Sequence, residues 1–205
     1  MIDIGSASGI SCALLARRGA KVIGVDMSPE LIKQAKQLWQ DWNAHITFMV
    51  GDAENLDIAN NTMDYCFFGG VLHHFPDRFK VYNESFRILK DGGMFIAIEP
   101  NSRDVLEIIE WKIAGWRGKL SPNEYPIDPI IMKKELEKIG YEQIHFFNIR
   151  HDIPFLAQFP ILNRFFSRKK GYRIKRPILS MINQFRAPIN CGTFFVIHGF
   201  KPIRN

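Results

Sequence analysis

The chain has 205 residues, of which 46% are hydrophobic and 23% are charged, as in a globular protein of one ordinary domain, and this excludes a repeat array. Its net charge of +6 is uneven: residues 1–149 carry 16 basic and 20 acidic residues (−4), and residues 150–205 carry 11 and one (+10). The three cysteines are too few for a disulfide framework or a zinc site. We find neither a signal peptide nor an apolar run of the ~18 residues that a membrane-spanning helix needs, and therefore expect a cytoplasmic protein.

The first hundred residues alternate short β-rich runs with helical patterns, which is typical of βαβ units on a parallel sheet. Ser28-Pro29 is a helix start, and residues 90–93 are a predicted turn before the fifth strand. The strands are expected at residues 1–4, 21–25, 45–50, 63–68 and 94–98, and the helices at residues 10–18, 28–42 and 77–89.

The remainder of the chain follows a looser pattern. We expect helices at residues 103–116 and 128–140, and two antiparallel strands at residues 141–149 and 193–200. The predicted fold is therefore α/β: a doubly wound, mostly parallel, seven-stranded sheet of Rossmann-like type, with its last strand antiparallel. We expect one domain with a cofactor-binding half (1–100), a helical acceptor-side segment (101–140) and a basic, aromatic lid insertion (150–192).

A glycine-rich turn lies directly between the first strand and its helix. Small residues there let backbone N–H groups approach a ligand closely. The loop has Gly5, Ala7 and Ile10 where a dinucleotide fingerprint has glycines, and it lacks the Gly-Lys-Ser/Thr ending of a phosphate loop. The whole motif reads Ile2-Asp3-Ile4-Gly5-Ser6-Ala7-Ser8-Gly9.

These residues resemble the first motif of the class I S-adenosylmethionine-dependent methyltransferases, Asp-x-Gly-x-Gly-x-Gly, and the stretch up to residue 100 resembles methyltransferase type 11 domains. Ala7 replaces the middle glycine, which should slightly narrow the loop. Related enzymes usually have one or two helices before the first strand. This sequence begins inside that strand, so we expect a fold without them. The resemblance implies S-adenosylmethionine as cofactor, and it also implies a set of cofactor-binding residues: Asp3, Gly5, Ser6, Ala7, Gly9, Asp26, Met27, Asp52, Ala53, Gly69 and Gly70.

Later positions carry the rest of the resemblance. Asp26 ends the second strand, where the family places the acid that binds the ribose hydroxyls, and a carboxylate suits a diol. The Asp52 position takes the adenine amino group in the family. The stretch 63–77, with Gly69 and Gly70, resembles the segment that lines the methionine end of the cofactor.

Methyl transfer from a sulfonium is an in-line displacement, so no protein nucleophile is required. A base is needed only when the acceptor arrives protonated. His73 and His74 follow the fourth strand and are the candidates for that base, and Glu99, at the end of the fifth strand, is a candidate contact to the acceptor. Each could instead cap or orient a neighbouring element. We expect no metal.

The sequence argues against nucleic acid as the acceptor. Enzymes that methylate the amino groups of adenine or glutamine resemble one another in an Asn/Asp-Pro-Pro-aromatic tetrapeptide after the fourth strand, where this chain has residues 68–71, Phe-Gly-Gly-Val. The Pro-Cys of cytosine enzymes is also missing. We expect a small-molecule or lipid-like acceptor. The basic segment 150–190 is then a lid over the acceptor site, a contact to an anionic membrane, or a solvated face or homodimer contact.

Two other functions remain open. The chain could be a non-catalytic module that keeps the fold and the cofactor, a reading that Ala7 motivates. A nicotinamide oxidoreductase would fit the sheet but not the spacing of the loop glycines.

Overall fold

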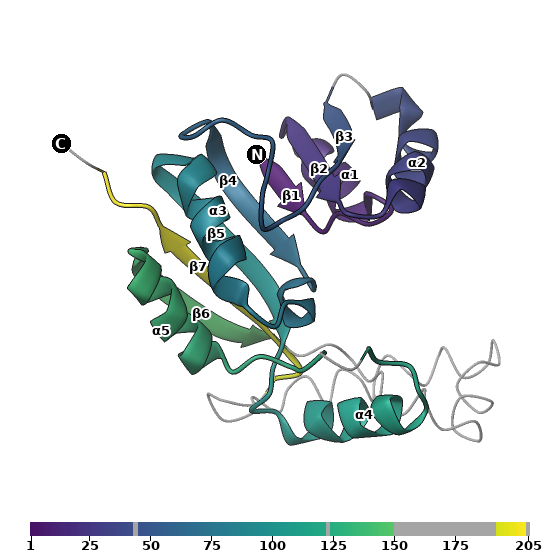
Figure 1. Ribbon diagram of the computed structural model, residues 1–205, viewed down its shortest axis with the longest axis vertical. Coiled ribbons are helices and arrows are strands. Elements are labelled where there is room, and N and C mark those ends of the chain that lie inside the picture. Colours follow the sequence, from purple (N-terminus) through teal and green to yellow (C-terminus); the bar gives the residue numbers. More distant parts are fainter. Residues whose placement is uncertain (43–44, 122–123, 150–191, 204–205) are drawn as a thin grey trace, which may run out of the picture.

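The computed structural model describes residues 1–42, 45–121, 124–149 and 192–203 (Figure 1). The predicted lid insertion, residues 150–192, lies outside the described residues except for Gly192. Within the described part of the chain, no helix is long and apolar enough to cross a membrane.

One seven-stranded sheet forms the centre of the fold, with the order β3-β2-β1-β4-β5-β7-β6. All neighbouring strands pair in parallel except β7, which is antiparallel to both β5 and β6. The predicted seven strands and antiparallel last strand are confirmed. The strands are β1 (Ile2–Ile4), β2 (Val22–Asp26), β3 (Ile46–Val50), β4 (Met63–Gly69), β5 (Leu89–Pro100), β6 (Glu142–Ile149) and β7 (Phe194–Phe200).

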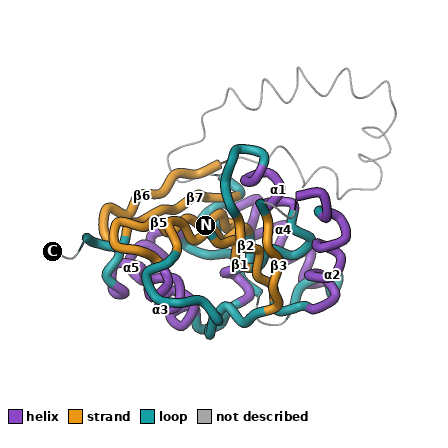
Figure 2. Tube along the Cα trace, turned by 90° about the horizontal axis from the view of Figure 1, so that it is seen from above, coloured by secondary structure: helices purple, strands orange, loops and turns teal. Residues whose placement is uncertain are grey.

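Helices cover both faces of the sheet, as in a doubly wound fold: α1 and α2 pack with β2 and β3, and α3 and α5 pack on the opposite face against β5, β6 and β7 (Figure 2). Figure 1 shows α4 beyond the carboxyl ends of β4 and β5. The helices are α1 (Ile10–Ala16), α2 (Pro29–Leu38), α3 (Arg78–Ile88), α4 (Val105–Trp116) and α5 (Pro129–Ile139), with short 3₁₀ turns η1 (Gln40–Trp42) and η2 (Leu72–His74).

Local signals set the helix ends. The Ser28 hydroxyl accepts a hydrogen bond from the Leu31 N–H at 3.3 Å, which caps α2 as predicted. Asp128 caps α5 by accepting from the Ile130 N–H at 2.8 Å, and Gly140 ends that helix with φ of 108°. The helix predicted over residues 28–42 ends earlier, at Leu38, and continues as η1.

The turn predicted at residues 90–93 is wrong, because these residues belong to β5. The strand begins at Leu89, opposite Met63, and its register then shifts before Met94. Two backbone hydrogen bonds of 2.9 Å hold this irregular stretch: Gly92 N–H donates to the Lys201 carbonyl, and Lys201 N–H donates to the Gly93 carbonyl. The partner comes from the far end of the chain, so local sequence gives no sign of it.

The chain reverses its winding between β1 and β4, which are neighbours at the middle of the sheet. Open α/β sheets bind ligands outside the carboxyl ends of their strands at such a switch point. The loops after β1 and β4 are therefore placed where the fold favours a ligand.

Candidate active site

The loop after β1 is folded back against β2. The N–H groups of Gly5 and Ser6 both donate to the Val25 carbonyl, at 2.8 and 2.9 Å. Gly5 has φ of 76°, and a Cβ atom there would lie 2.5 Å from Cγ2 of Val71, which follows β4. Only glycine allows the two loops to approach this closely.

The same loop requires small residues at its far end. Gly9 precedes α1 with φ of 79°, and a Cβ atom there would lie 2.5 Å from the Phe48 ring. Ala7, which replaces the family's middle glycine, keeps the conformation of a glycine, with φ of 45°. This left-handed conformation strains the backbone at Ala7, and the predicted narrowing of the loop stays a prediction.

Asp26 is bound to this loop. Its Oδ2 atom accepts a hydrogen bond from Ala7 N–H, and its Oδ1 atom accepts one from Ser28 N–H, each at 2.9 Å. Each carboxylate oxygen keeps a further lone pair, so the group can still accept hydrogen bonds from a diol. Met27, the next predicted residue, is 80% exposed.

Asp3 lies behind the loop and is 1% exposed. Its Oδ2 atom accepts hydrogen bonds from the Ser11 hydroxyl and, at 3.1 Å, from the Cys12 thiol, both on α1. Burial raises the pKa of Asp3, and the nearby carboxylate of Asp26 adds to that effect. In this arrangement Asp3 fixes the loop to α1, and its predicted contact with the cofactor stays a prediction.

The other predicted cofactor residues line the neighbouring strand ends. Asp52 follows β3, is exposed, and accepts from the Glu54 N–H at 2.9 Å, while Ala53 is buried. Gly69 ends β4, and Gly70 follows it with φ of 71°, where a Cβ atom would meet no other atom within 4 Å. These residues and the β1 loop lie at the same edge of the sheet.

Glu99 is fully buried at the carboxyl end of β5, and its carboxylate contacts three residues of the segment after β4. Its Oε1 atom accepts from the N–H groups of Val71 and Leu72, at 3.0 and 2.8 Å. Its Oε2 atom lies 2.8 Å from Nδ1 of His73. A carboxylate only accepts, so Nδ1 carries the proton and the Nε2 atom of a neutral His73 ring keeps its lone pair.

His74 has a different partner, although its ring lies 4.2 Å from that of His73, centroid to centroid. Its Nδ1 atom lies 3.1 Å from Oε1 of Glu124, and its side chain is 48% exposed. His73, His74 and Glu124 each offer one ligand atom within 4.8 Å of the others, which is the geometry of a candidate metal group among the described residues. The expected absence of a metal stays a prediction.

The first turns of α4 add an acidic group that the sequence pattern did not predict. The rings of Trp111 and His73 pack edge to face with their centroids 5.4 Å apart, and the Nε1 atom of Trp111 donates to Glu107 at 2.8 Å. Burial, reinforced by the nearby charges of Glu110 and Asp104, raises the pKa of Glu107 to about 7. The sequence pattern predicts a helix over residues 103–116 but does not indicate that its carboxylates are buried.

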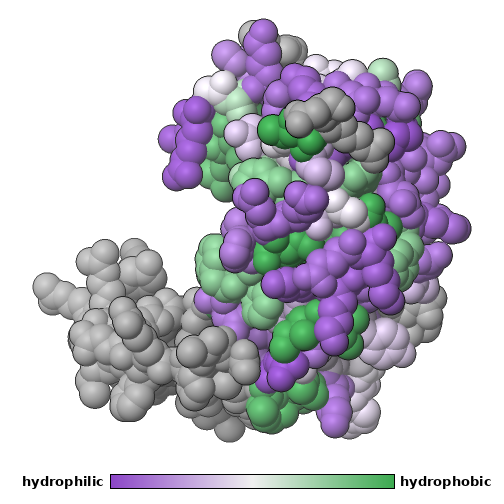
Figure 3. Space-filling model, turned by 90° about the vertical axis from the view of Figure 1, so that its left-hand side faces the viewer, coloured by the Kyte–Doolittle hydropathy of each residue, from purple (hydrophilic) through white to green (hydrophobic). Residues whose placement is uncertain are grey.

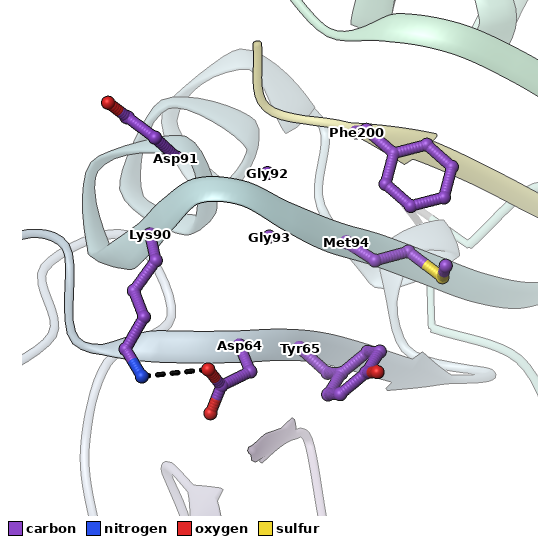
Figure 4. Close-up of a pocket in the computed structure, with 8 residues that line it drawn as sticks. All are labelled: Asp64, Tyr65, Lys90, Asp91, Gly92, Gly93, Met94 and Phe200. Atoms are coloured by element: carbon purple, nitrogen blue, oxygen red, sulfur yellow. Dashed lines mark hydrogen bonds and ion pairs between the residues drawn. The ribbon is translucent and has the colours of Figure 1, made fainter. Parts of the chain in front are cut away.

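A surface hollow of about 240 Å³ lies elsewhere, at the amino end of β4 and the irregular start of β5 (Figure 4). An ion pair of 2.7 Å between Lys90 and Asp64 crosses it. Because it lies at the opposite edge from the β1 loop, it has no part in the site described above.

Comparison with known proteins supplies the class. A family model described as "Methyltransferase domain" matches residues 2–97. A ubiquinone/menaquinone biosynthesis C-methyltransferase of Rickettsia bellii is 32% identical over 175 residues, which cover 73% of this chain and 71% of that protein. An arsenite methyltransferase of Halobacterium salinarum is 30% identical over 97 residues, 45% of this chain and 25% of that protein.

Solved structures share the fold. Phosphoethanolamine N-methyltransferase 2 of Haemonchus contortus, solved with phosphomonomethylethanolamine and S-adenosylhomocysteine, has a TM-score of 0.70 and 20% identity, covering 98% of this chain and 49% of that chain. The present chain therefore spans about half the length of that enzyme and about a quarter of the Halobacterium protein.

The chain belongs to the class I S-adenosylmethionine-dependent methyltransferases. Within that class it is a methyltransferase-domain protein, and the cofactor of the family is S-adenosylmethionine.

The residues at the carboxyl edge fit this cofactor. Among the described residues, the buried Ser6 hydroxyl has no hydrogen-bond partner, which leaves a polar atom in the loop for a ligand. Asp26 keeps lone pairs for ribose hydroxyls, and Gly70 borders open space. The predicted residues of the β1 loop, of β2 and of β4 thus come together at one edge.

Proposed function

We propose that this chain transfers a methyl group from S-adenosylmethionine to a small-molecule or lipid-like acceptor. The observation that carries the proposal is the meeting, at the switch point of the sheet, of the strained loop of residues 5–9 with Asp26 on one side and the His73–Glu99 pair on the other. When bound, the cofactor supplies an electrophilic methyl group and its own leaving group. The chain's task is to position the reactants and to exclude water.

The cofactor would lie along the ends of β1, β2, β3 and β4. Asp26 would accept the ribose hydroxyls, and Asp52 with Ala53 would meet the adenine. Gly70 would give room at the methionine end, since a Cβ atom there would meet no atom within 4 Å, and Gly5 would contribute by letting the β1 loop approach Val71 closely. The remaining proposed contacts are Asp3, Ser6, Ala7, Gly9, Met27 and Gly69.

His73 would act on the acceptor as a general base. The Glu99 carboxylate holds the Nδ1–H of that ring, so the Nε2 lone pair is available for a proton from a hydroxyl or an acidic C–H. Glu99 is buried and its contacts are internal, so it acts through His73 as a positioning residue. His74 lies beside this ring and would orient it.

The acceptor class is supported by relatives and by the setting of the base. The C-methyltransferase of Rickettsia bellii takes part in ubiquinone and menaquinone biosynthesis, and a demethylmenaquinone methyltransferase of Staphylococcus saprophyticus is 34% identical over 90 residues, which cover 44% of this chain and 38% of that protein. The Trp111 ring beside His73 would suit an aromatic or apolar acceptor.

Calorimetric titration with S-adenosylhomocysteine and with NAD tests the cofactor site. We expect S-adenosylhomocysteine to bind and NAD to give no heat. Asp26→Asn should weaken binding about tenfold, because one charge-assisted hydrogen bond is lost. Asp41→Asn, at an exposed residue of η1, is the matched control and should bind as the unsubstituted chain does. Binding of NAD alone would overturn the assignment.

Transfer itself is tested with methyl-labelled cofactor and a panel of phenolic, quinol, lipid and sugar acceptors. We expect label in the phenolic, quinol or lipid fraction, and a loss of transfer in His73→Ala. Binding of S-adenosylhomocysteine without transfer to any acceptor would favour the non-catalytic module instead.

A further inference from the structure

Helix α4 has its polar and apolar faces reversed. Its three carboxylates, Asp104 at its start, Glu107 and Glu110, are only 5%, 4% and 9% exposed. Val105, at 68%, and Trp116, at 87%, are among its most exposed side chains. A helix on the surface of a globular protein normally has the opposite pattern, with charges outward and apolar residues inward.

The exposed apolar residues form one stripe. At 3.6 residues per turn, Val105, Ile109 and Trp116 fall within about 40° of one another around the helix axis, and the exposed Lys112 lies beside them. The stripe runs for about 16 Å along the helix. Figure 3 shows hydrophobic side chains at the surface of the lower end of the molecule, the end at which Figure 1 places α4.

The inner face of the same helix is tied to the proposed catalytic base. Glu107 accepts the Trp111 indole hydrogen bond, and the Trp111 ring contacts His73 edge-on. A surface that binds the outer stripe is therefore separated from His73 by about the thickness of helix α4. This places the stripe where an acceptor dissolved in an apolar phase would arrive.

Charge identifies the partner. Within residues 103–121, every exposed charged side chain is basic: Arg103, Lys112, Arg117 and Lys119. An apolar stripe with a tryptophan at its end and lysine or arginine beside it is typical of a helix lying in the headgroup region of an anionic bilayer. In sequence, residues 150–205 carry the same sign of charge, +10.

We propose that the outer face of α4 docks on the surface of an anionic phospholipid membrane. Trp116, Ile109 and Val105 enter the boundary between headgroups and acyl chains, and Lys112, Arg117 and Lys119 contact the phosphates. The sequence alone pointed to residues 150–190 for such a contact, whereas this surface lies on a described helix. The inference goes beyond methyl transfer and is tested without turnover, so its failure leaves that proposal standing.

Co-sedimentation of the full chain with vesicles is the test. We compare phosphatidylcholine alone with phosphatidylcholine mixed with phosphatidylglycerol, and expect binding to the mixed vesicles that salt weakens. Ile109→Glu combined with Trp116→Glu should reduce partitioning at least tenfold. Ile131→Glu, at a 53% exposed isoleucine of α5, is the matched control and should bind as the unsubstituted chain does. Thermal melts establish that all variants are folded.

Depth is read from Trp116. Lipids brominated along their acyl chains should quench the protein's fluorescence, and Trp116→Phe should remove most of that quenching. Three outcomes would overturn the proposal: absence of binding to either vesicle, equal binding by the double variant, or a concentration-dependent dimer of the unsubstituted chain that Ile109→Glu dissociates.

Discussion

The Nδ1 atom of His73 lies 2.8 Å from the Oε2 atom of Glu99, and this pair sets which nitrogen of the neutral ring carries the proton. Glu99→Gln should reverse the tautomer. The glutamine carbonyl oxygen can still accept from the Val71 and Leu72 N–H groups, but its amide then donates to Nδ1. The ring proton moves to Nε2, and the base loses its lone pair.

We expect Glu99→Gln to lower kcat about 100-fold with little change in the KM for the cofactor. Ring nitrogen chemical shifts of His73 report the tautomer before any acceptor is known. Glu124→Gln, which alters only the partner of His74, is the control and should leave the His73 tautomer unchanged. Full transfer rate in Glu99→Gln would remove the base from the mechanism.

Gly5 and Gly19 test how much the approach of the two loops contributes to stability. Both have positive φ, 76° and 89°, but a Cβ atom at Gly5 meets Val71 whereas one at Gly19 has no atom within 4 Å. Gly19→Ala should cost about 1 kcal/mol, the strain of the left-handed conformation alone. Gly5→Ala should cost about 3 kcal/mol, because the clash is added.

Urea unfolding of the two variants, with Val71→Ala and the double variant, separates the two contributions. The clash predicts a favourable coupling of about 1–2 kcal/mol between Gly5→Ala and Val71→Ala. Equal losses in Gly5→Ala and Gly19→Ala would mean that Val71 moves aside.

Glu107 predicts a dependence of stability on pH. Its pKa is raised to about 7, so between the ordinary value of 4.5 and about 7 the folded chain binds more protons than the unfolded chain. Stability therefore falls as the pH rises through this window, and the loss is complete above it. Glu107→Gln keeps an acceptor for Trp111 and removes the charge.

We expect Glu107→Gln to stabilise the chain by about 2 kcal/mol near pH 8 and by almost nothing near pH 5. Glu137→Gln, at an exposed glutamate of α5, should change stability little at either pH. Chemical denaturation at the two pH values measures both. A gain that is the same at both values would show that Glu107 is ionised throughout.

Much of the fold could be predicted because its signals are local. The Ser28 cap, the Asp128 cap and Gly140 mark helix ends within a few residues of themselves. The start of β5 could not be predicted. Residues 90–93 have the composition of a turn, and they extend the strand because Lys201, far along the chain, pairs with Gly92 and Gly93.

The site divides in the same way. The residues of the β1 loop and Asp26 follow consecutive strands, so a parallel sheet brings their ends together. The partners of these residues depend on side-chain packing that no spacing encodes. Glu99 contacts His73, Asp3 accepts a hydrogen bond from Ser11 on α1, and Glu107 accepts one from Trp111.

Metal ions should inhibit this chain. The proposed reaction needs no metal, so a chelator should leave the transfer rate unchanged. Added zinc should lower the rate, because His73, His74 and Glu124 present ligand atoms within 4.8 Å of one another, and a zinc ion bound there would occupy the Nε2 lone pair of the base. Glu99 would hold the other nitrogen of that ring, as carboxylates do behind metal-bound histidines.

Transfer measured against zinc concentration checks this. Glu124→Gln should raise the inhibiting concentration of zinc at least tenfold while keeping most of the activity, because it weakens one ligand and leaves the His73–Glu99 pair intact. Lys133→Ala, at an exposed residue of α5 away from these ligands, is the control and should leave the inhibition unchanged. Loss of activity on chelation would contradict this prediction and would mean that a metal ion takes part in the reaction, because general-base catalysis by His73 requires none.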